Sequence, residues 1–176
     1  MTFTRDLTGP RQRQGIRDVM EGLLAAELVQ PSSVLWLLSA WISDIEILDN
    51  RTRAFSALRP DWAPTQIRFS QVIEGIADRG GRVAVVLRDA DHNESFIHKL
   101  KTVQRQQPGR VGIALAPDAH DKSLIGDGYI LSGSMNFTQN GLSINDEHVL
   151  LRIDREAAAN RRLSLHQRWD PLLRWD

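Results

Sequence analysis

Apolar residues follow two different patterns along the chain, and each pattern predicts a different kind of element. In residues 11–29 the apolar positions recur every three to four residues, with Ile16, Met20 and Leu24 on one face, which indicates an amphipathic helix. Residues 33–42 are almost continuously apolar, which is typical of a strand covered on both faces. Because the two patterns alternate, we predict an α/β fold with a mixed, largely parallel sheet flanked by helices on both faces.

The remaining segments continue this alternation. A helix that ends at Gly80 and Gly81 precedes a buried strand over 83–87. Farther along, we predict a helix over 91–106, strands over 111–115, 120–126 and 129–132, a strand within 146–153 and a last helix over 154–169. Residues 49–65 contain two prolines and predict a long irregular excursion.

Length and composition fit a single folded unit. The 176 residues are 41% hydrophobic and 25% charged, close to the averages of globular proteins. We therefore predict one domain over 1–176, with an N-terminal helix in 1–30, the excursion at 49–65, a motif region at 119–151 and a C-terminal helix and tail at 154–176. The chain begins without a secretory apolar stretch, and its longest apolar run is too short to span a bilayer. We expect a cytoplasmic protein without stable membrane association.

The charged residues and the missing cysteines limit the possible chemistry. Lysine plus arginine and aspartate plus glutamate each total 22, so no global field attracts nucleic acid and any anion binding must be local. The chain has no cysteine, which excludes disulfides, thiol nucleophiles and cysteine-ligated metal sites. Any catalysis must therefore use histidine, lysine, carboxylates or hydroxyls.

The stretch AHDKSLIGDGYILSGSMNFT, at 119–138, combines such groups. On the predicted strand, His120 and Lys122 would point to the same side, roughly 6.6 Å apart, where they could address one small anion. Lysine supplies a point charge for a phosphate oxygen, and histidine can act as a nucleophile or carry a proton. Asp127 lies past the strand end, which favours a positioning role. Each residue by itself is more often a solvated strand residue.

A turn follows that can add neutral donors to the same anion. Gly133 begins the turn, and Ser134 and Asn136 offer a hydroxyl, an amide and exposed backbone N–H groups that suit phosphate. A Gly-Ser turn is commonplace alone. Together with the preceding histidine and lysine, it predicts a phosphate site that contains a nucleophile.

The motif His120-x-Lys122-x4-Asp127, followed by Gly133-Ser134-x-Asn136, resembles the HKD signature of the phospholipase D superfamily. The later NDEHVLL is similar to the small bacterial endonucleases of that superfamily, which carry one HKD motif per chain. Two departures stand out. Five residues separate the aspartate from the glycine where the family usually has six, and a glycine at position 126 replaces the usual bulky apolar residue.

The resemblance implies a mechanism without metal or cofactor. His120 would attack phosphorus to form a phosphohistidine, and a second histidine would protonate the leaving oxygen and then activate water. Because the chain has one motif, the second histidine would come from another copy, in a homodimer with the active site on its twofold axis. Lys122, Ser134 and Asn136 would hold the nonbridging oxygens. Glu147 would orient the histidine, although a salt-bridged strand glutamate is an open alternative.

The resemblance implies that the protein cleaves a phosphodiester bond, but it does not identify the molecule that contains this bond. A short chain with one motif is similar to the nuclease branch, so we expect cleavage of nucleic acid, DNA rather than RNA. Basic residues support this expectation, although a solvated helix face is an equal alternative: Lys99, Lys101, Arg105 and Arg110 in a stretch without acids, with Arg161, Arg162 and Arg168 near the end. A second hypothesis is a non-enzymatic or partner-dependent subunit of a DNA-modification or phage-defence system. The third is a phospholipid phosphodiesterase.

Overall fold

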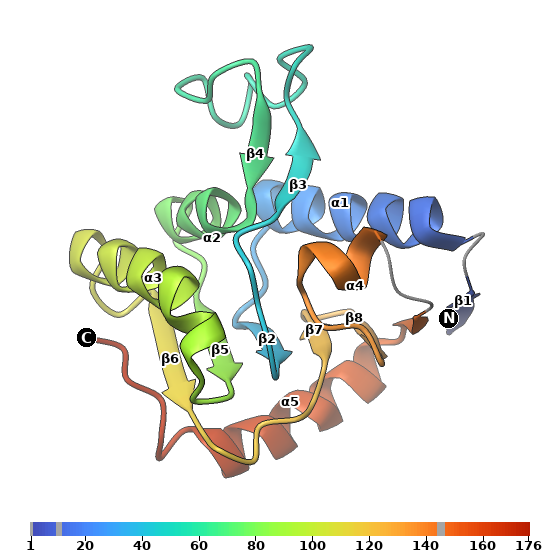
Figure 1. Cartoon of the computed structure of the whole chain (residues 1–176), viewed down its shortest axis with the longest axis vertical. Helices are drawn as coiled ribbons and strands as arrows, with labels where there is room; N and C mark the ends of the chain where they lie inside the picture. The colour runs from blue at the N-terminus through green and yellow to red at the C-terminus, as the bar shows by residue number, and fades with distance from the viewer. Residues whose placement is uncertain (1, 10–11, 144–146) are drawn as a thin grey trace.

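The computed structural model describes residues 2–9, 12–143 and 147–176, and a seven-stranded sheet forms its centre (Figure 1). Across the sheet the strands are β1 (Phe3–Thr8), β9 (His148–Ile153), β8 (Tyr129–Gly133), β7 (Ser123–Ile125), β2 (Leu35–Ser39), β5 (Val83–Leu87) and β6 (Val111–Leu115). A small second sheet pairs β3 (Glu46–Asp49) with β4 (Gln66–Arg68). The small sheet projects from one end of the molecule together with the excursion at 49–65.

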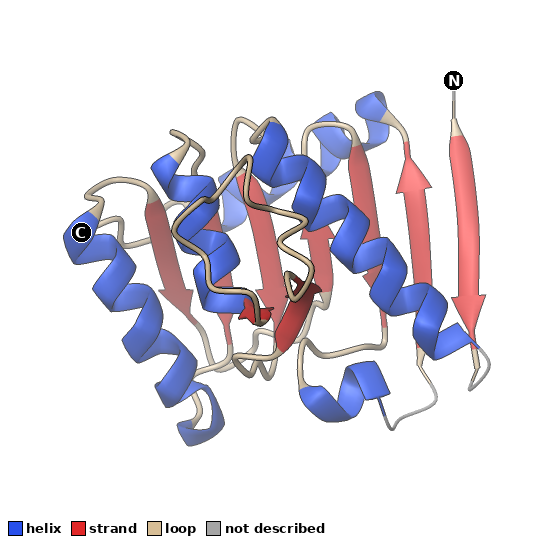
Figure 2. Cartoon of the chain, turned by 90° about the horizontal axis from the view of Figure 1, so that it is seen from above, coloured by secondary structure: helices blue, strands red, loops and turns tan. Residues whose placement is uncertain are grey.

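Helices cover both faces of the large sheet (Figure 2). On one face lie α1 (Arg13–Val29), α2 (Phe69–Asp78), α3 (Glu94–Gln106) and the short α4 (Gln139–Ser143), and on the other lies α5 (Arg155–Trp169). The predicted mixed sheet with helices on both faces is confirmed. Within the part of the chain that the structure describes, no helix is long and apolar enough to span a bilayer.

Parallel pairing has a smaller share of the sheet than we expected. It joins β2, β5 and β6, whereas β7, β8, β9 and β1 pair antiparallel. The connections explain this difference. Helices α2 and α3 precede β5 and β6 and allow parallel crossovers, whereas the link from β7 to β8 is too short for a crossover and makes these strands antiparallel. The longer connection from β8 to β9 contains α4 and begins and ends at the same edge of the sheet, so this pair is antiparallel as well.

The continuous apolar run of β2 reflects two separate cores. Leu35 and Leu37 pack into the core beneath α1 to α4, and Trp36 and Leu38 pack into the core beneath α5. All four side chains are almost completely buried. The strand therefore has no solvent face, and its sequence shows no polar alternation.

Several element boundaries agree with the sequence pattern. Strands β5 and β6 have the expected limits, and α5 begins at Arg155, one residue after its expected start. Two expectations are corrected. Strand β1 precedes the first helix, which begins only at Arg13, and the strand expected from residue 120 begins at Ser123. Strand β1 escaped notice because five of its six residues are polar or exposed and only Leu7 is buried.

Candidate active site

The motif residues gather at one edge of the large sheet, where several strand ends meet. Lys122 directly precedes β7, Ser134 directly follows β8, and His148 begins β9. Because β8 runs antiparallel to both neighbours, its carboxyl end lies beside the amino ends of β7 and β9. The carboxyl ends of β2 and β5 lie at the same edge, since β2 also runs antiparallel to β7. This edge is the candidate active site.

His120 and Lys122 lie in the extended segment before β7, which corrects the expectation that both belong to the strand. Pairing between β7 and β2 stops at Ser123 and Leu38, so the preceding residues have no partner on that side. The Lys122 ammonium donates to the His120 backbone carbonyl at 2.8 Å. The His120 side chain is exposed, and no described residue hydrogen-bonds its ring. The imidazole is thus open to an incoming ligand.

Lys122 lies among other charged groups. Burial lowers the pKa of its ammonium first, and the positive charge of Arg88 lowers it further, whereas Asp121 and Glu147 oppose the shift. Two like charges that act on each other in a partly buried place favour a nearby anion, which offsets their repulsion. This electrostatic arrangement suits a phosphate group.

Ser134 connects β8 to β9 at the site. Its hydroxyl donates to the Glu147 carboxylate and accepts the His148 backbone N–H at 3.0 Å, and its own N–H donates to the His148 carbonyl at 2.9 Å. Glu147 therefore contacts the motif serine, and its charge also acts on Lys122. The role expected for Glu147, orienting the nucleophilic histidine, stays a prediction.

Gly133 permits the close approach of these strands. A Cβ atom at this position would collide with the His148 carbonyl oxygen and would lie 3.0 Å from the Val149 Cα. Both obstacles are backbone atoms, which cannot rotate away. The glycine of the motif is therefore a requirement of the β8–β9 pairing.

Asn136 is oriented by the end of β2. Its side-chain oxygen accepts the Trp41 N–H at 3.2 Å and the Ser39 hydroxyl at 3.4 Å. These two donors define which side of the amide carries the oxygen. The Asn136 NH₂ has no partner among the described residues and can donate to a ligand; the predicted contact with a phosphate oxygen stays a prediction.

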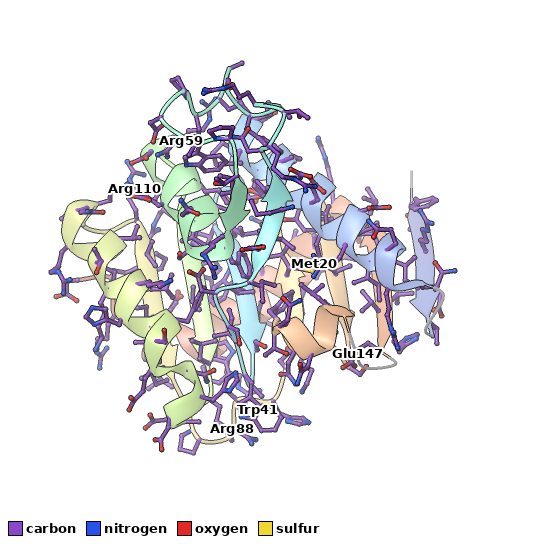
Figure 3. The ribbon with its side chains drawn as sticks, turned by 45° about the horizontal axis from the view of Figure 1, so that its top comes forward. Met20, Trp41, Arg59, Arg88, Arg110 and Glu147 are labelled. Atoms are coloured by element: carbon purple, nitrogen blue, oxygen red, sulfur yellow. The ribbon has the colours of Figure 1, made fainter. Side chains whose placement is uncertain are left out.

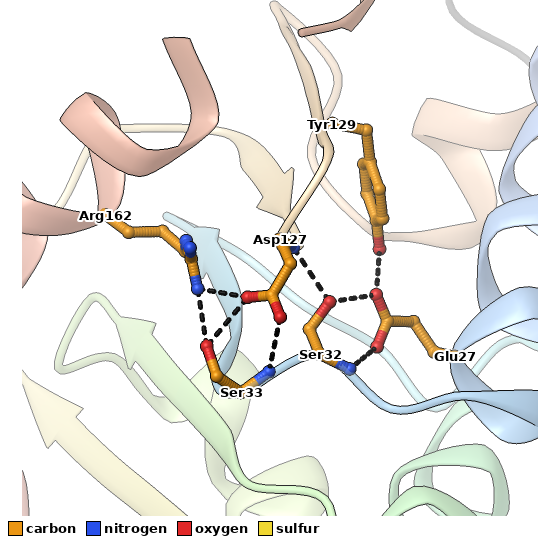
Figure 4. A network of polar contacts seen from close by, with 6 residues as sticks. All are labelled: Glu27, Ser32, Ser33, Asp127, Tyr129 and Arg162. Atoms are coloured by element: carbon orange, nitrogen blue, oxygen red, sulfur yellow. Dashed lines mark hydrogen bonds and ion pairs between the residues drawn. The ribbon is translucent and has the colours of Figure 1, made fainter. Parts of the chain in front are cut away.

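Asp127 lies at the opposite end of β7 from Lys122, in a separate polar network (Figure 4). Its carboxylate accepts the Ser33 N–H at 3.0 Å and the Ser33 hydroxyl at 2.7 Å, and it pairs with Arg162 of α5. The three-residue strand separates it from the other motif residues by on the order of 10 Å or more. The structure therefore does not bring Asp127 together with His120, and its contacts connect α5 to the loop after α1.

We expect Asp127→Asn to lower stability while leaving the chemistry of the folded protein intact. One acceptor oxygen becomes a donor that faces either the Ser33 N–H or Arg162, which costs about 1–2 kcal/mol at this half-exposed position. Urea unfolding should show the loss, with Ser33→Ala as a milder control. A fall in kcat of the folded variant of more than about tenfold would instead give the carboxylate a direct catalytic role.

Glu27 and Tyr129 extend the same network. The buried Glu27 carboxylate accepts the Ser32 N–H and hydroxyl, each at 2.7 Å, and the Tyr129 hydroxyl at 3.0 Å. A Cβ at Gly126 would lie 2.6 Å from Glu27 Oε1 and against the Tyr129 ring. The network therefore fills the space of the bulky residue that the family usually has at this position, which accounts for one of the two departures.

Burial raises the pKa of Glu27 above its ordinary value of 4.5, although hydrogen bonds from Ser32 and Tyr129 lower it in part. A raised pKa means that the folded protein binds more protons than the unfolded chain above pH 4.5, so stability falls as pH rises through that window. We expect Glu27→Gln to lack this dependence. Unfolding free energies from pH 4 to 8 should show the wild type losing stability relative to the variant, and a constant difference would contradict the assignment.

The four residues expected to contact nucleic acid are not all available. The Lys99 ammonium pairs with Asp44, Arg105 donates to the Thr102 hydroxyl at 3.0 Å, and Arg110 donates to the Gly80 carbonyl at 2.5 Å. These contacts interrupt the expected basic strip, of which Lys101 is the remaining member. Their role in binding stays a prediction.

Sequence reasoning missed Arg88 and Trp41, which lie at the same edge. Arg88 directly follows β5, Trp41 follows β2, and the guanidinium carbon lies 5.7 Å from the centre of the indole ring (Figure 3). The available signal was their position: both come just after a buried strand, where ligand sites of open α/β sheets form. Among the residues that the structure describes, no group of three or more histidines and carboxylates could hold a metal ion.

The fold resembles solved structures over its whole length. NucT from Helicobacter pylori superposes with a TM-score of 0.67 at 16% identity, covering 100% of both chains. Nuc, a phospholipase D family member from Salmonella typhimurium, gives 0.64 at 14% identity, covering 99% of this chain and 97% of that one. Phosphatidylserine synthase from Haemophilus influenzae gives 0.60 at 14% identity, covering 98% of this chain and 39% of that one.

Sequence comparison supports the same relationship. The family model described as "Cardiolipin synthase, PLD-like domain" matches residues 55–169, which is more than half of the chain and includes the HKD motif. A search of curated protein sequences found no match. The family match and the fold agree with the resemblance that the motif predicted. The chain therefore belongs to the PLD-like domain family of the phospholipase D superfamily, a superfamily of phosphodiester hydrolases.

Proposed function

We propose that the protein is a metal-independent nuclease that cleaves DNA through a phosphohistidine on His120. The observation that carries this proposal is the sheet edge itself. His120, whose imidazole hydrogen-bonds to no described residue, is two residues from Lys122, and the chain brings Lys122, Arg88 and the NH₂ of Asn136 to the same edge of the sheet. A phosphodiester needs a nucleophile together with cations and donors for its nonbridging oxygens, and this edge offers both.

In the first step, a ring nitrogen of His120 attacks phosphorus, and the P–O bond to the leaving group breaks as the N–P bond forms. His120 of the partner subunit gives its proton to the leaving oxygen. In the second step, that partner histidine takes a proton from water, the water oxygen attacks phosphorus, and the N–P bond breaks. Both histidines then return to their starting protonation states. Lys122 and Asn136 stabilise the charge on the nonbridging oxygens throughout.

The second histidine is assigned to a partner because the chain carries a single HKD motif, and none of its other four histidines belongs to one. His166 packs edge-on against Trp36 at 4.9 Å on the α5 face, and His98 is exposed on α3. His148 contacts the Thr8 hydroxyl of β1 through Nδ1 at 2.7 Å, and His92 contacts the Ser43 hydroxyl through Nε2 at 3.3 Å. A twofold symmetric homodimer would place two copies of His120 at one axis.

Cleavage of labelled single- and double-stranded DNA in excess EDTA tests this function. Light scattering should find a dimer at the assay concentration, and RNA and phospholipid vesicles should be run beside the DNA. Cutting of DNA without metal supports the proposal. Hydrolysis of vesicles alone would favour the phospholipid phosphodiesterase. A folded dimer that binds DNA and cuts no substrate would favour the partner-dependent subunit of a DNA-modification or defence system.

A further inference from the structure

Trp41 and Arg88 form a pair beside the proposed phosphate site, and we call these two side chains the Trp41–Arg88 platform. Trp41 is 42% exposed although it is a large apolar side chain, and the Arg88 guanidinium lies over its ring. An exposed indole fixed by a cation is suited to stacking against a flat aromatic ligand. The mechanism proposed above does not use this ring.

The platform is fixed in place by a buried side chain. Asn93, in the short helix η2 (Asp91–Asn93), is completely buried, and its amide donates to the Ala40 carbonyl at 2.9 Å and to the Arg88 carbonyl at 2.7 Å. Its side-chain oxygen accepts the Ile42 N–H at 2.8 Å. One residue thus clamps the backbone on both sides of Trp41 and also the backbone of Arg88. The two loops are preorganised with respect to each other.

The platform is also joined to the phosphate site. The Trp41 N–H donates to Asn136, a motif residue, at 3.2 Å, and the charge of Arg88 lowers the pKa of Lys122. A ligand whose phosphate lies between Lys122 and Arg88 would therefore place its next group against the indole. In a nucleic acid, that neighbouring flat group is a base.

We propose that the Trp41–Arg88 platform stacks an unpaired nucleobase next to the scissile phosphate, so that the site selects single-stranded nucleic acid or a locally unpaired strand. A base within a duplex is stacked on its neighbours and cannot offer its face. Because any base can stack on an indole ring, the platform would distinguish single strands from duplexes but would not distinguish base sequences. This inference deepens the proposed function and rests on its phosphate site.

The test measures binding of short labelled oligonucleotides to the full-length protein carrying His120→Ala, which prevents turnover. To this background we would add Trp41→Ala, Trp41→Phe or the control Trp175→Ala. Trp175 also carries an arginine, with the Arg82 guanidinium 4.1 Å from its ring, but it lies in the C-terminal tail, away from the site. The alanine at 41 keeps the backbone N–H that Asn136 accepts, and circular dichroism would confirm folding.

We expect Trp41→Ala to raise the Kd for single-stranded DNA and RNA by roughly 5- to 100-fold, Trp41→Phe to raise it less, and Trp175→Ala to leave it unchanged. On a strand whose bases are replaced by abasic residues, or on a perfect duplex, Trp41→Ala should have no effect. An unchanged Kd on single strands, or the same loss on abasic strands, would overturn the inference. If Trp41→Ala weakens binding of single strands as expected but the wild-type protein cuts no nucleic acid, the nuclease proposal fails, whereas the stacking role of the Trp41–Arg88 platform is supported.

Discussion

Replacing His120 with alanine is expected to lower the rate of phosphodiester cleavage by about 10⁴-fold or more, because the substitution removes both the nucleophile and the partner's general acid from each dimer. The side chain is exposed and hydrogen-bonds to no described residue through its ring, so its loss should cost little stability. Initial rates on a labelled DNA strand in EDTA, together with a thermal unfolding curve, measure both quantities.

His98→Ala is the matched control for this variant. His98 is also exposed, but it lies on α3 and contributes no side chain to the edge where the motif residues meet. We expect it to cut at the wild-type rate. A His120→Ala protein that folds and retains more than about a tenth of wild-type activity would show that the nucleophile lies elsewhere.

Lys122→Met is expected to lower kcat by about 10²- to 10³-fold, the effect of removing one donor to a developing oxyanion. The methionine fills a similar volume but cannot neutralise a nonbridging oxygen, and it also loses the contact to the His120 carbonyl at 2.8 Å. Lys122→Arg keeps a cation and should recover part of the rate. Steady-state kinetics on the three proteins separate the effect on kcat from an effect on KM.

The pH dependence gives a second measurement for the same residue. Burial and the nearby Arg88 lower the pKa of Lys122 below its ordinary value of 10.5, so the cation is lost at a lower pH than for a free lysine. The rate should therefore fall on the alkaline side in the wild type, and Lys122→Arg should shift that fall to higher pH, since arginine stays protonated. Identical alkaline profiles would show that another group controls them.

The sequence predicted the sheet and the motif well because both are encoded locally. Strands β5 and β6 are uninterrupted apolar runs between helix and turn signals, and their limits followed from those signals. Ser134 and Asn136 come soon after the apolar run at 129–132, and this spacing predicted a turn. In the structure, both residues follow the end of β8. The resemblance to the HKD signature then gave the family, which the match over 55–169 confirms.

Other features depend on contacts between distant segments. Asp127 is near the other motif residues in sequence, but a strand runs between them, so its partners are Ser33 and Arg162. Trp41 and Arg88 lie 47 positions apart in the chain, and the parallel pairing of β2 with β5 together with the buried Asn93 brings their loops together. The role of Asn93 could not be predicted from the local sequence, because an asparagine in a loop after a strand is common.

The central claim is that each active site needs His120 from two subunits, and a defined heterodimer tests it most directly. Wild-type and His120→Ala chains, each with its own tag, would be co-expressed and the mixed dimer isolated through both tags. The account predicts that this heterodimer cuts DNA at least about 10²-fold more slowly than the wild-type dimer, because one histidine cannot serve as both nucleophile and general acid. A heterodimer with half of the wild-type activity would show that each chain carries a complete site, and would contradict the claim.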